Sequence, residues 1–408
     1  MIEYGLLGEK LGHSFSPQIH KALGGYDYRL LPTPPEEVEA LLRRRAFRGL
    51  NVTIPYKQTV IPLCDRVDPR AAAIGAVNTI VNRDGLLEGC NTDIDGLIDL
   101  ARRAGVDMVG KKVVILGSGG TSRTAQAAAG ELGAASVTVV SRGGADNYGN
   151  LSRHGDAQVL INTTPVGMYP RCGVSPVDLD LFPALTGVLD VVYNPLRTAL
   201  VLAAEDRGIP CSGGLPMLVS QARRAAELFT GTTIPDSRME EALAALTRQV
   251  RSVVLVGMPG CGKSAVGRAL ARRLGKEFVD MDALISARAG KSIPDIFAQD
   301  GEEAFRTLES QIACEAGSRT GCVISTGGGA VTRPENRDPL RQNGVVVHLT
   351  RDLALLPRSG RPVSQSTDLE ELWARRAPLY AAFADLTVPN SGAVEAAADT
   401  IVKELNAL

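Results

Sequence analysis

Residues 252–264 read Ser252-Val-Val-Leu-Val256-Gly257-Met-Pro-Gly260-Cys-Gly262-Lys263-Ser264. The short apolar run predicts a buried strand, and helical periodicity follows over Ala265–Leu274. A strand, a Gly-x4-Gly-Lys-Ser loop and a helix in this order indicate a phosphate-binding loop, whose backbone N–H groups surround nucleotide phosphates. The residues expected to contact the nucleotide are Gly257, Gly260, Cys261, Gly262, Lys263, Ser264 and Ala265.

An earlier glycine-rich turn, Gly117-Ser118-Gly119-Gly120-Thr-Ser122, lies between the predicted strand Val113–Leu116 and an alanine-rich helix. A second predicted strand, Val137–Val140, follows this helix. This context is typical of a dinucleotide site, where Gly117 permits the tight turn and Gly119 lets the backbone approach a pyrophosphate.

The end of that second strand discriminates between the two nicotinamide cofactors. An NAD site usually places Asp or Glu there, whereas this chain has Ser141-Arg142. A guanidinium pairs with a 2′-phosphate in a bidentate manner, so the sequence favours NADP(H). The alternative is that Arg142 is a solvated surface charge.

The chain alternates short apolar runs with helical stretches, and it does so twice. Further buried strands are predicted at Gln158–Ile161, Gly187–Val192, Cys322–Ser325 and Val345–Leu349. We therefore expect an α/β protein with parallel sheets covered by helices on both faces. The two halves meet at a short connection, residues 247–251, after the helix-like Met239–Leu246.

Composition excludes several classes of protein. Lys and Arg number 44 against 45 Asp and Glu, so no basic excess favours nucleic-acid binding. No apolar run reaches the roughly 18 residues that span a bilayer, and the N-terminus has no secretory pattern. The seven cysteines and four histidines show no metal-ligand spacing, so we expect reduced, mostly buried cysteines in a cytoplasmic protein.

Polar clusters surround the first glycine-rich turn in the sequence. Each stands near a turn signal and is rich in groups that bind hydroxyls or carboxylates, although singly each has a plain explanation as a cap or turn. The clusters are His13-Ser14-Phe15-Ser16-Pro17, Asn51-Val-Thr53-Ile-Pro55-Tyr-Lys57, Gly75-Ala-Val-Asn78-Thr79, Gly89-Cys-Asn91-Thr92-Asp93 and Gly214-Leu-Pro-Met217-Leu-Val-Ser-Gln221.

With these clusters, residues 1 to about 246 resemble the shikimate dehydrogenase family, as do Asn162-Thr-Thr-Pro165-Val-Gly167-Met168 and Asp190-Val-Val-Tyr193-Asn194-Pro195. The resemblance implies a split substrate domain, residues 1–96 completed by helices in 213–246, and a Rossmann-like NADP domain, residues 97–212. It also implies reduction of 3-dehydroshikimate to shikimate with NADP(H).

The same resemblance assigns roles to individual residues. Lys57 is the expected acid/base group beside Asp93, and an alkoxide formed by hydride addition needs such a proton and charge nearby. The expected substrate-binding residues are Ser14 and Ser16 for the carboxylate, Thr53, Asn78, Asp93 and Gln221 for ring hydroxyls, and Tyr193. The expected cofactor-binding residues are Gly117, Ser118, Gly119, Gly120, Ser141, Arg142, Thr163, Gly214 and Met217. The family often has Asn-Arg-Thr where this chain has Ser141-Arg142-Gly143, which predicts one lost contact to the NADP phosphate.

Several polar groups follow the phosphate-binding loop. No guanine-reading Asn-Lys-x-Asp is present, which argues against a GTPase switch. Paired acids after a strand, as in Asp280-Met-Asp282, can organise Mg²⁺ and orient an acceptor hydroxyl. Residues 252–408 resemble shikimate kinase in this pair and in Gly301-Glu-x-x-Phe305-Arg306-x-x-Glu309, Ser325-Thr-Gly-Gly-Gly329, Arg361-Pro362 and Arg376-Ala-Pro-Leu-Tyr380.

This second resemblance implies a P-loop domain of the nucleoside-monophosphate-kinase type that uses ATP and Mg²⁺. Ser264 and Asp280 would support Mg²⁺, and Asp282 would bind the acceptor hydroxyl. Arg306 and Arg376 would hold the shikimate carboxylate, with Gly327, Gly328 and Gly329 along the ring. Arg361 would reach the transferred phosphate from a lid near Leu353–Ser366, alongside Lys263.

The two resemblances together predict a bifunctional enzyme for consecutive steps on one small molecule, with 3-dehydroshikimate and shikimate as substrates. Alternatives stay open for each half. The first is a quinate/shikimate dehydrogenase or a non-catalytic cofactor-binding module, and the second is a kinase for another small acid. The sequence predicts no nucleic-acid or membrane partner and gives no oligomeric state.

Overall fold

The computed structural model describes residues 2–12, 14–356 and 369–407. Its contacts divide the chain into two compact units. Unit 1 comprises Met1–Met168, Val174–Asn194 and Leu200–Thr247, and unit 2 comprises Tyr169–Gly173, Pro195–Ala199 and Arg248–Leu408.

Unit 1 begins with a mixed sheet in the order β2-β1-β3-β5-β6-β4. Its strands are β1 (Ile2–Gly8), β2 (Tyr28–Pro32), β3 (Phe47–Val52), β4 (Arg66–Val67), β5 (Thr79–Arg83) and β6 (Leu86–Cys90), with helices α1 (Ser16–Gly24), α2 (Pro35–Arg44) and α3 (Pro69–Ile74). β1 pairs in parallel with β2 and β3, whereas β5 runs antiparallel to β3 and β6. Leu7, Leu50 and Ile80 are fully buried in its core.

The second sheet of unit 1 is wholly parallel, in the order β11-β10-β9-β7-β8. It contains β7 (Lys112–Leu116), β8 (Ser136–Val140), β9 (Val159–Asn162), β10 (Gly187–Asp190) and β11 (Cys211–Ser212), with α5 (Gly120–Glu131) and α6 (Ala199–Asp206). The chain leaves β7 for β8 on one side and returns to β9 on the other. Ligands of open parallel sheets bind at such a switch point, beyond the carboxyl ends of the strands.

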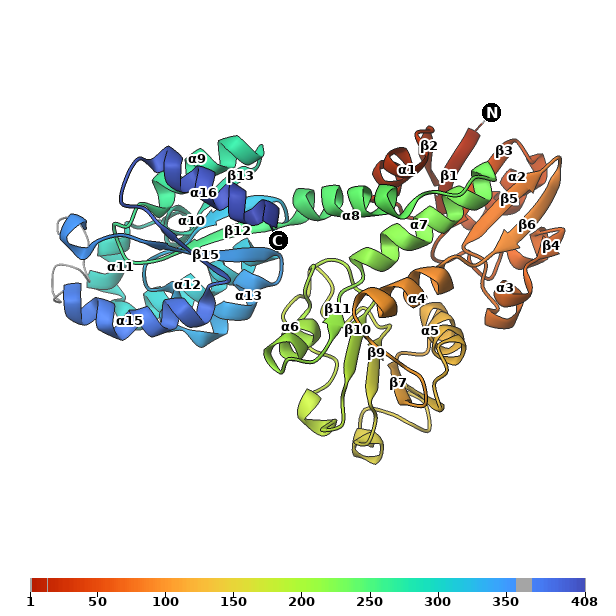
Figure 1. Cartoon of the computed structure of the whole chain (residues 1–408), viewed down its shortest axis with the longest axis horizontal. Helices are drawn as coiled ribbons and strands as arrows, with labels where there is room; N and C mark the ends of the chain where they lie inside the picture. The colour runs from red at the N-terminus through yellow and green to blue at the C-terminus, as the bar shows by residue number, and fades with distance from the viewer. Residues whose placement is uncertain (1, 13, 357–368, 408) are drawn as a thin grey trace. The chain divides into compact units, whose positions relative to one another are not determined.

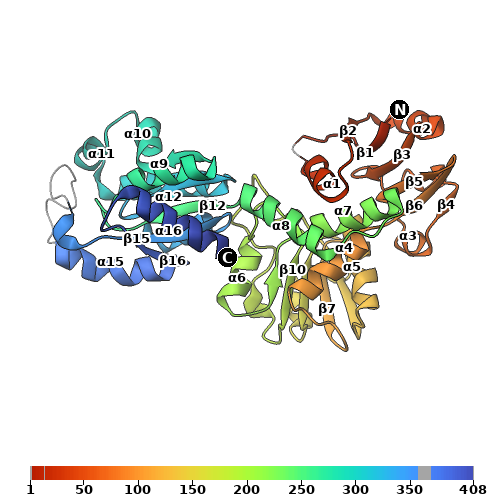
Figure 2. The same ribbon diagram turned by 45° about the horizontal axis from the view of Figure 1, so that its top comes forward.

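Helices α4 (Asp93–Arg103) and α7 (Leu215–Thr230) lie side by side between the two sheets of unit 1 (Figures 1 and 2). Ile94, Leu97 and Leu100 of α4 are fully buried. The predicted boundary between residues 96 and 97 therefore falls within a helix rather than in a loop.

Unit 2 has a parallel sheet in the order β13-β14-β12-β15-β16. Its strands are β12 (Ser252–Val256), β13 (Glu277–Asp280), β14 (Cys322–Ser325), β15 (Gly344–Thr350) and β16 (Leu386–Pro389). Its helices are α9 (Lys263–Leu274), α10 (Met281–Ala289), α11 (Ile293–Gln299), α12 (Gly301–Ser318), α13 (Arg337–Arg341), α15 (Leu369–Phe383) and α16 (Val394–Ala407). Figure 1 shows α9 and α16 over one face of this sheet and α12, α13 and α15 over the other.

Short 3-10 helices complete the described secondary structure, at Ile61–Leu63, Leu151–His154, Leu179–Leu181, Ala330–Thr332, Pro334–Asn336 and Leu353–Leu355. Helix α8 (Asp236–Val250) continues through most of the predicted connection 247–251, so Arg251 alone separates it from β12. Lys276 caps this helix end, because its Nζ donates to the carbonyls of Arg248, Gln249 and Arg251 at 2.7, 3.1 and 2.8 Å.

All seven cysteines are free, but the expectation that most are buried is wrong. Cys261 and Cys322 are buried, and Cys314 of α12 is exposed. The other four cysteines are partly buried, because these four lie in loops and at strand ends rather than at sheet centres. Within the described ranges, none of the helices is long and apolar enough to cross a bilayer.

Candidate functional site

Unit 1 brings Lys57 and Asp93 together, as the sequence predicts. The Lys57 Nζ donates to Asp93 Oδ2 at 2.6 Å, and both side chains are partly buried. Lys57 follows β3, and its carbonyl accepts from the N–H of Val77 at 2.8 Å, which ties it to the segment before β5. Asp93 is the first residue of α4, where a carboxylate is favoured by the helix dipole. The pair combines a proton donor with a group that holds it in place.

The predicted carboxylate ligands Ser14 and Ser16 lie at the start of α1, and the Ser14 hydroxyl donates to that of Ser16 at 3.2 Å. Thr53 follows β3 directly, and its N–H donates to Leu7 O at 2.9 Å. Gln221 lies in α7, where its Nε2 donates to the carbonyl of Leu218 at 2.9 Å. Ser14, Ser16 and Thr53 therefore lie at ends of elements of the first sheet region, whereas Gln221 lies within α7.

Asn78 lies in a buried polar network. Its Nδ2 donates to Thr92 Oγ1 at 3.1 Å, and its Oδ1 accepts from the Thr92 N–H at 2.7 Å and from Thr79 Oγ1 at 3.0 Å. The network thus fixes the turn that leads into Asp93. Tyr193 follows β10 of the second sheet, and its ring lies edge-on to that of Phe15, between Ser14 and Ser16 in the sequence, with 6.2 Å between centroids.

The predicted cofactor turn follows β7 at the switch point of the second sheet. Gly117 has φ +104°, a conformation that favours glycine, and its N–H donates to Val140 O at 2.8 Å. Ser118, Gly119 and Gly120 are exposed, and nothing lies within 4 Å of a Cβ built on either glycine. Thr163 flanks the turn from the end of β9, donating its hydroxyl to Leu116 O at 2.6 Å. The open turn at the start of α5 fits a pyrophosphate.

Ser141 and Arg142 come directly after β8, and Arg142 is exposed. The first carboxylate beyond them is Asp146, whose Oδ1 lies 2.7 Å from Nε2 of His154. That acid is engaged with a histidine, while the arginine at the strand end faces solvent. The arrangement suits a cofactor phosphate better than ribose hydroxyls.

Gly214 and Met217 lie at the start of α7. A Cβ at Gly214 would meet Val191 O at 2.1 Å, so glycine permits the close approach of α7 to the end of β10. Met217 is buried, and its carbonyl would lie 2.8 Å from a Cβ at Gly96 of α4. Both predicted cofactor residues therefore also contribute to the packing around α4 and α7, the two helices that lie between the sheets of unit 1.

In unit 2 the loop after β12 is wound tightly. Gly257, Gly260 and Gly262 have φ of +145°, +87° and +100°. The Lys263 Nζ donates to the carbonyls of Gly257 and Met258 at 2.8 and 3.1 Å. The loop therefore encloses its own cation in a cradle that fits nucleotide phosphates. The predicted Cys261 is fully buried beneath it.

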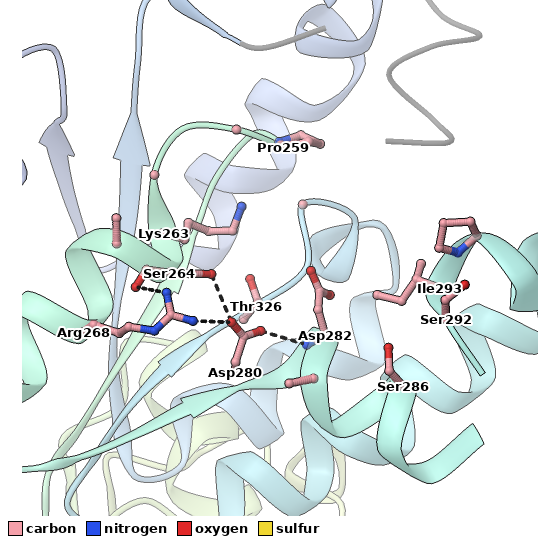
Figure 3. Close-up of a pocket in the computed structure, with 16 residues that line it drawn as sticks. Pro259, Lys263, Ser264, Arg268, Asp280, Asp282, Ser286, Ser292, Ile293 and Thr326 are labelled. Atoms are coloured by element: carbon pink, nitrogen blue, oxygen red, sulfur yellow. Dashed lines mark hydrogen bonds and ion pairs between the residues drawn. The ribbon is translucent and has the colours of Figure 1, made fainter. Parts of the chain in front are cut away.

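The predicted metal ligands are in contact. The Ser264 hydroxyl donates to Asp280 Oδ2 at 3.1 Å, and Asp280 Oδ1 accepts from the N–H of Asp282 at 3.2 Å (Figure 3). Hydroxyl and carboxylate oxygens are donors that Mg²⁺ prefers, so these residues fit the ion. Arg268, which sequence reasoning missed, lies 3.9 Å from Asp280 Oδ2 and rests on the ring of Phe278.

A cavity of about 770 Å³ opens beside these groups. Lys263, Ser264, Asp280 and Asp282 line one part of it (Figure 3). Gly328 and Thr326 of the segment after β14 line another, together with Ser286, Ser292 and Ile293 of the α10–α11 region. The nucleotide loop and the predicted acceptor residue Asp282 therefore share one cavity.

Arg306 and Arg376 are buried, at 6 % and 4 % exposure, and neither lines the cavity. Arg306 is paired: its Nη1 lies 2.7 Å from Glu309 Oε2 and its Nη2 3.1 Å from Glu302 Oε1. Burial raises the pKa of Glu309 although Arg306 opposes that shift.

Arg376 has no ion pair within the described part of the chain. Its Nη1 donates to Gly328 O at 3.1 Å, and its buried Nε has no partner there. Burial lowers the pKa of Arg376, and the charge of Arg306 lowers it further. An uncompensated buried guanidinium is costly, so this geometry calls for an anionic ligand.

In unit 2, some residues near the site are missing from the sequence-based prediction, and some predicted residues lie outside the described ranges. Arg268 carries no sequence signal beyond its i+4 spacing to Ser264. Glu302 falls in the kinase-like segment Gly301–Glu309 but receives no role from the resemblance, and the contacts of both residues emerge only in the fold. Arg361 and the predicted lid from residue 357 to 366 lie outside the described residues.

Comparison with protein-family models gives three matches. The model for the shikimate dehydrogenase substrate binding domain matches residues 6–80, and that for the shikimate 5′-dehydrogenase C-terminal domain matches residues 214–244. The model for shikimate kinase matches residues 259–406.

Among curated proteins, the chain is 38 % identical to the shikimate dehydrogenase (NADP(+)) of Moorella thermoacetica over 268 residues, which is 58 % of this chain and 91 % of that protein. A solved shikimate 5-dehydrogenase from Thermus thermophilus, in complex with NADP(H) and shikimate, matches with a TM-score of 0.54 and 34 % identity over 60 % of this chain and 99 % of that one. A quinate dehydrogenase from Corynebacterium glutamicum in complex with NAD matches with a TM-score of 0.55 and 29 % identity, covering 60 % and 99 %.

Proposed function

Because the chain belongs to the shikimate dehydrogenase family and also contains a shikimate kinase domain, we propose that one polypeptide carries out two consecutive reactions. Unit 1 reduces 3-dehydroshikimate to shikimate with NADPH. Unit 2 phosphorylates shikimate with Mg-ATP. The observation that carries the proposal is that each unit brings its own predicted reacting groups together: Lys57 contacts Asp93 in unit 1, and Asp282 shares a cavity with the phosphate-binding loop in unit 2.

The chemistry of unit 1 rests on Lys57. NADPH supplies a hydride to the substrate ketone when it is bound. Hydride addition leaves negative charge on the carbonyl oxygen, and the Lys57 ammonium donates the proton that neutralises it. Asp93 holds the ammonium at 2.6 Å and keeps it beside the substrate. Ser14 and Ser16 supply hydroxyls for the substrate carboxylate.

The chemistry of unit 2 rests on positioning and charge. Mg-ATP supplies the phosphoryl group when it is bound. Asp282 accepts a hydrogen bond from the acceptor hydroxyl, and Lys263 turns from its loop carbonyls toward the phosphates. Ser264 and Asp280 hold the ion. Arg376 and Arg306 recognise the carboxylate, and the buried charge of Arg376 is then compensated.

The experiment is a paired assay on the purified full chain. One reaction contains shikimate and NADP⁺ and follows NADPH by absorbance. The other contains shikimate and Mg-ATP and follows ADP. Both rates are expected, and a folded protein that shows neither would refute the proposal.

The same assay decides the alternatives. Substituting quinate for shikimate and NAD⁺ for NADP⁺ tests the activity named for the Corynebacterium relative. The engagement of Asp146 by His154 favours NADP⁺. A faster reaction with NAD⁺ would contradict that preference, and cofactor binding without turnover would make unit 1 a binding module.

A further inference from the structure

The carbonyl oxygen of Gly328 accepts two hydrogen bonds from the same helix. Tyr380 Oη donates to it at 2.6 Å and Arg376 Nη1 at 3.1 Å, both from α15. Tyr380 is fully buried, and burial raises its pKa, so its hydroxyl stays protonated and remains a donor at neutral pH. Tyr380 has no role so far in the reaction.

Gly328 belongs to a glycine loop, residues 327–329, that touches both sides of the site. A Cβ at Gly328 would meet Pro259 of the nucleotide loop at 2.6 Å. A Cβ at Gly329 would meet Arg306 Nη1 at 2.2 Å, and one at Gly327 would meet Asp282 Oδ1 at 3.0 Å. A shift of this loop would therefore disturb the acceptor groups and the nucleotide loop together.

The ring of Tyr380 packs against a residue of the sheet. It stacks on His348 of β15 with centroids 4.8 Å apart and planes 18° apart, and Trp373 lies 6.4 Å away on the same stack. β15 is hydrogen-bonded to β12, the strand that leads into the nucleotide loop. The hydroxyl is thus held at a defined position relative to the sheet.

The guanidinium of Arg376 has two partners to bind, the Gly328 carbonyl and the carboxylate of the acceptor. In the structure its Nη1 donates to Gly328 O, and a carboxylate that bound the Nε, which has no partner among the described residues, would draw the guanidinium toward itself and weaken that bond. If Arg376 left this partly buried carbonyl without another donor, the loss would cost up to the free energy of a broken hydrogen bond. A carbonyl has two lone pairs, so Tyr380 can keep the oxygen satisfied throughout.

We propose that Tyr380 is a positioning residue for the acceptor site: its hydroxyl holds the glycine loop in place while Arg376 turns to the carboxylate of the acceptor. The inference rests on the proposed kinase function and deepens it, because it names the group that lets the guanidinium change partners.

The test is Tyr380→Phe, which removes one oxygen and keeps the ring. Trp373 is the single tryptophan of the chain and lies on the Tyr380 stack, so its fluorescence can report binding directly. Shikimate is titrated into wild type and variant, and ATP binding is measured separately by calorimetry. We expect the dissociation constant for shikimate to rise about 3- to 10-fold, the worth of one such hydrogen bond, with little change for ATP.

Two control variants separate the hydroxyl from the packing. His348→Phe keeps an aromatic stack under Tyr380 and should leave shikimate affinity near that of wild type. Tyr56→Phe in unit 1 removes a comparable bond, Tyr56 Oη to Thr33 O at 2.6 Å, and should leave both kinase ligands unaffected. Dehydrogenase activity checks that the chain is intact in the two unit 2 variants, and thermal unfolding checks it in Tyr56→Phe.

The outcomes are distinct. Unchanged shikimate affinity in folded Tyr380→Phe would overturn the inference and leave the kinase function standing. Equal weakening of ATP and shikimate, or an equal effect of His348→Phe, would also overturn it, since the cause would then be general packing. Failure of the wild-type chain to bind shikimate in unit 2 would refute the proposed function, and the inference with it.

Discussion

The two glycine-rich turns of this chain are both proposed to bind phosphates through backbone N–H groups, but they are built differently. In unit 1, Gly119 and Gly120 face open space, because a Cβ on either residue would have no neighbouring atom within 4 Å. In unit 2, a Cβ at Gly257 would meet Leu349 O at 2.4 Å, and one at Gly262 would meet Asn390 Nδ2 at 2.4 Å. Glycine makes room for a ligand in the first turn and for the chain itself in the second.

The turns also differ in where their positive charge comes from. Lys263 is bonded to its own loop, so the second turn already encloses a cation. Residues 117–122 of the first turn include no lysine or arginine; Arg123 follows them in α5, and Arg142 follows β8. The second site is therefore formed in advance, whereas the first relies on several segments meeting around the cofactor.

The largest expected effect separates the units through their lysines. Lys57→Ala removes the proton donor of unit 1, so dehydrogenase kcat should fall about 10²- to 10⁴-fold while kinase activity persists. Lys263→Ala removes the charge that faces the phosphates, so kinase kcat should fall about 10²- to 10³-fold while dehydrogenase activity persists. Both activities are measured on each purified variant. Loss of both activities in one folded variant would show that the two reactions depend on each other.

A second prediction contrasts a crowded glycine with an open one. Gly262→Ala places a side chain at φ +100° against Asn390, whose Nδ2 donates to Cys261 O at 2.7 Å, and should destabilise unit 2 by about 3 kcal/mol. Gly120→Ala meets no atom and adds helix propensity at the start of α5, so unit 1 should keep or slightly gain stability.

Thermal unfolding checks this pair of variants, with Trp373 fluorescence following unit 2. NADPH titration adds a second measurement, because residue 120 belongs to the proposed cofactor turn and a methyl group there should weaken NADPH binding. Equal stability losses in the two variants would contradict the described difference between the turns.

The sequence predicts the strands next to both turns because they are short, β-branched and buried on both faces. Val113–Leu116 and Cys322–Ser325, for example, fall within β7 and β14. It also predicts that Lys57 meets Asp93, although only through resemblance, since 36 positions separate them and no local pattern joins them. The pairing of β3 with β5 and the position of α4 after β6 create that contact.

Other features depend on the tertiary structure and have no local signal. The engagement of Asp146 by His154 needs the loop after β8 to fold back, and the shared acceptor Gly328 O needs α15 to pack against the glycine loop. The predicted connection 247–251 contains the boundary between the two units, but α8 continues through it to Val250. Thr247, Gln249 and Val250 carry no helix stop, and Lys276 caps the helix from a distant part of the sequence.

A third prediction concerns pH and the buried histidine of unit 1, His20. Burial lowers the pKa of His20 to about 3, and its neutral ring stacks on Tyr28 at 4.0 Å with its Nδ1 2.7 Å from Tyr26 Oη. The unfolded chain binds this proton near pH 6.5, so unit 1 stability is complete above pH 6.5. It falls by about 1.4 kcal/mol per pH unit below that value, down to about pH 3.

Calorimetry of the unit 1 transition between pH 7 and pH 5 measures the slope. His20→Phe keeps the stack but does not titrate, so its stability should vary less with pH over the same range. An identical slope in wild type and variant would assign the acid sensitivity to other groups.

The smallest expected effect tests the separated charge of the first turn. If Arg142 supplies the cation that the turn lacks, Arg142→Ala should raise the KM for NADPH about 10-fold and leave that for NADH nearly unchanged, because only NADPH carries the 2′-phosphate. Arg207→Ala is the matched control, because it removes another exposed arginine of unit 1, which follows α6 and pairs with Asp180. Equal effects of Arg142→Ala on both cofactors would mean that this arginine is a solvated surface charge, and the charge facing the phosphate would have to come from the backbone at the start of α5.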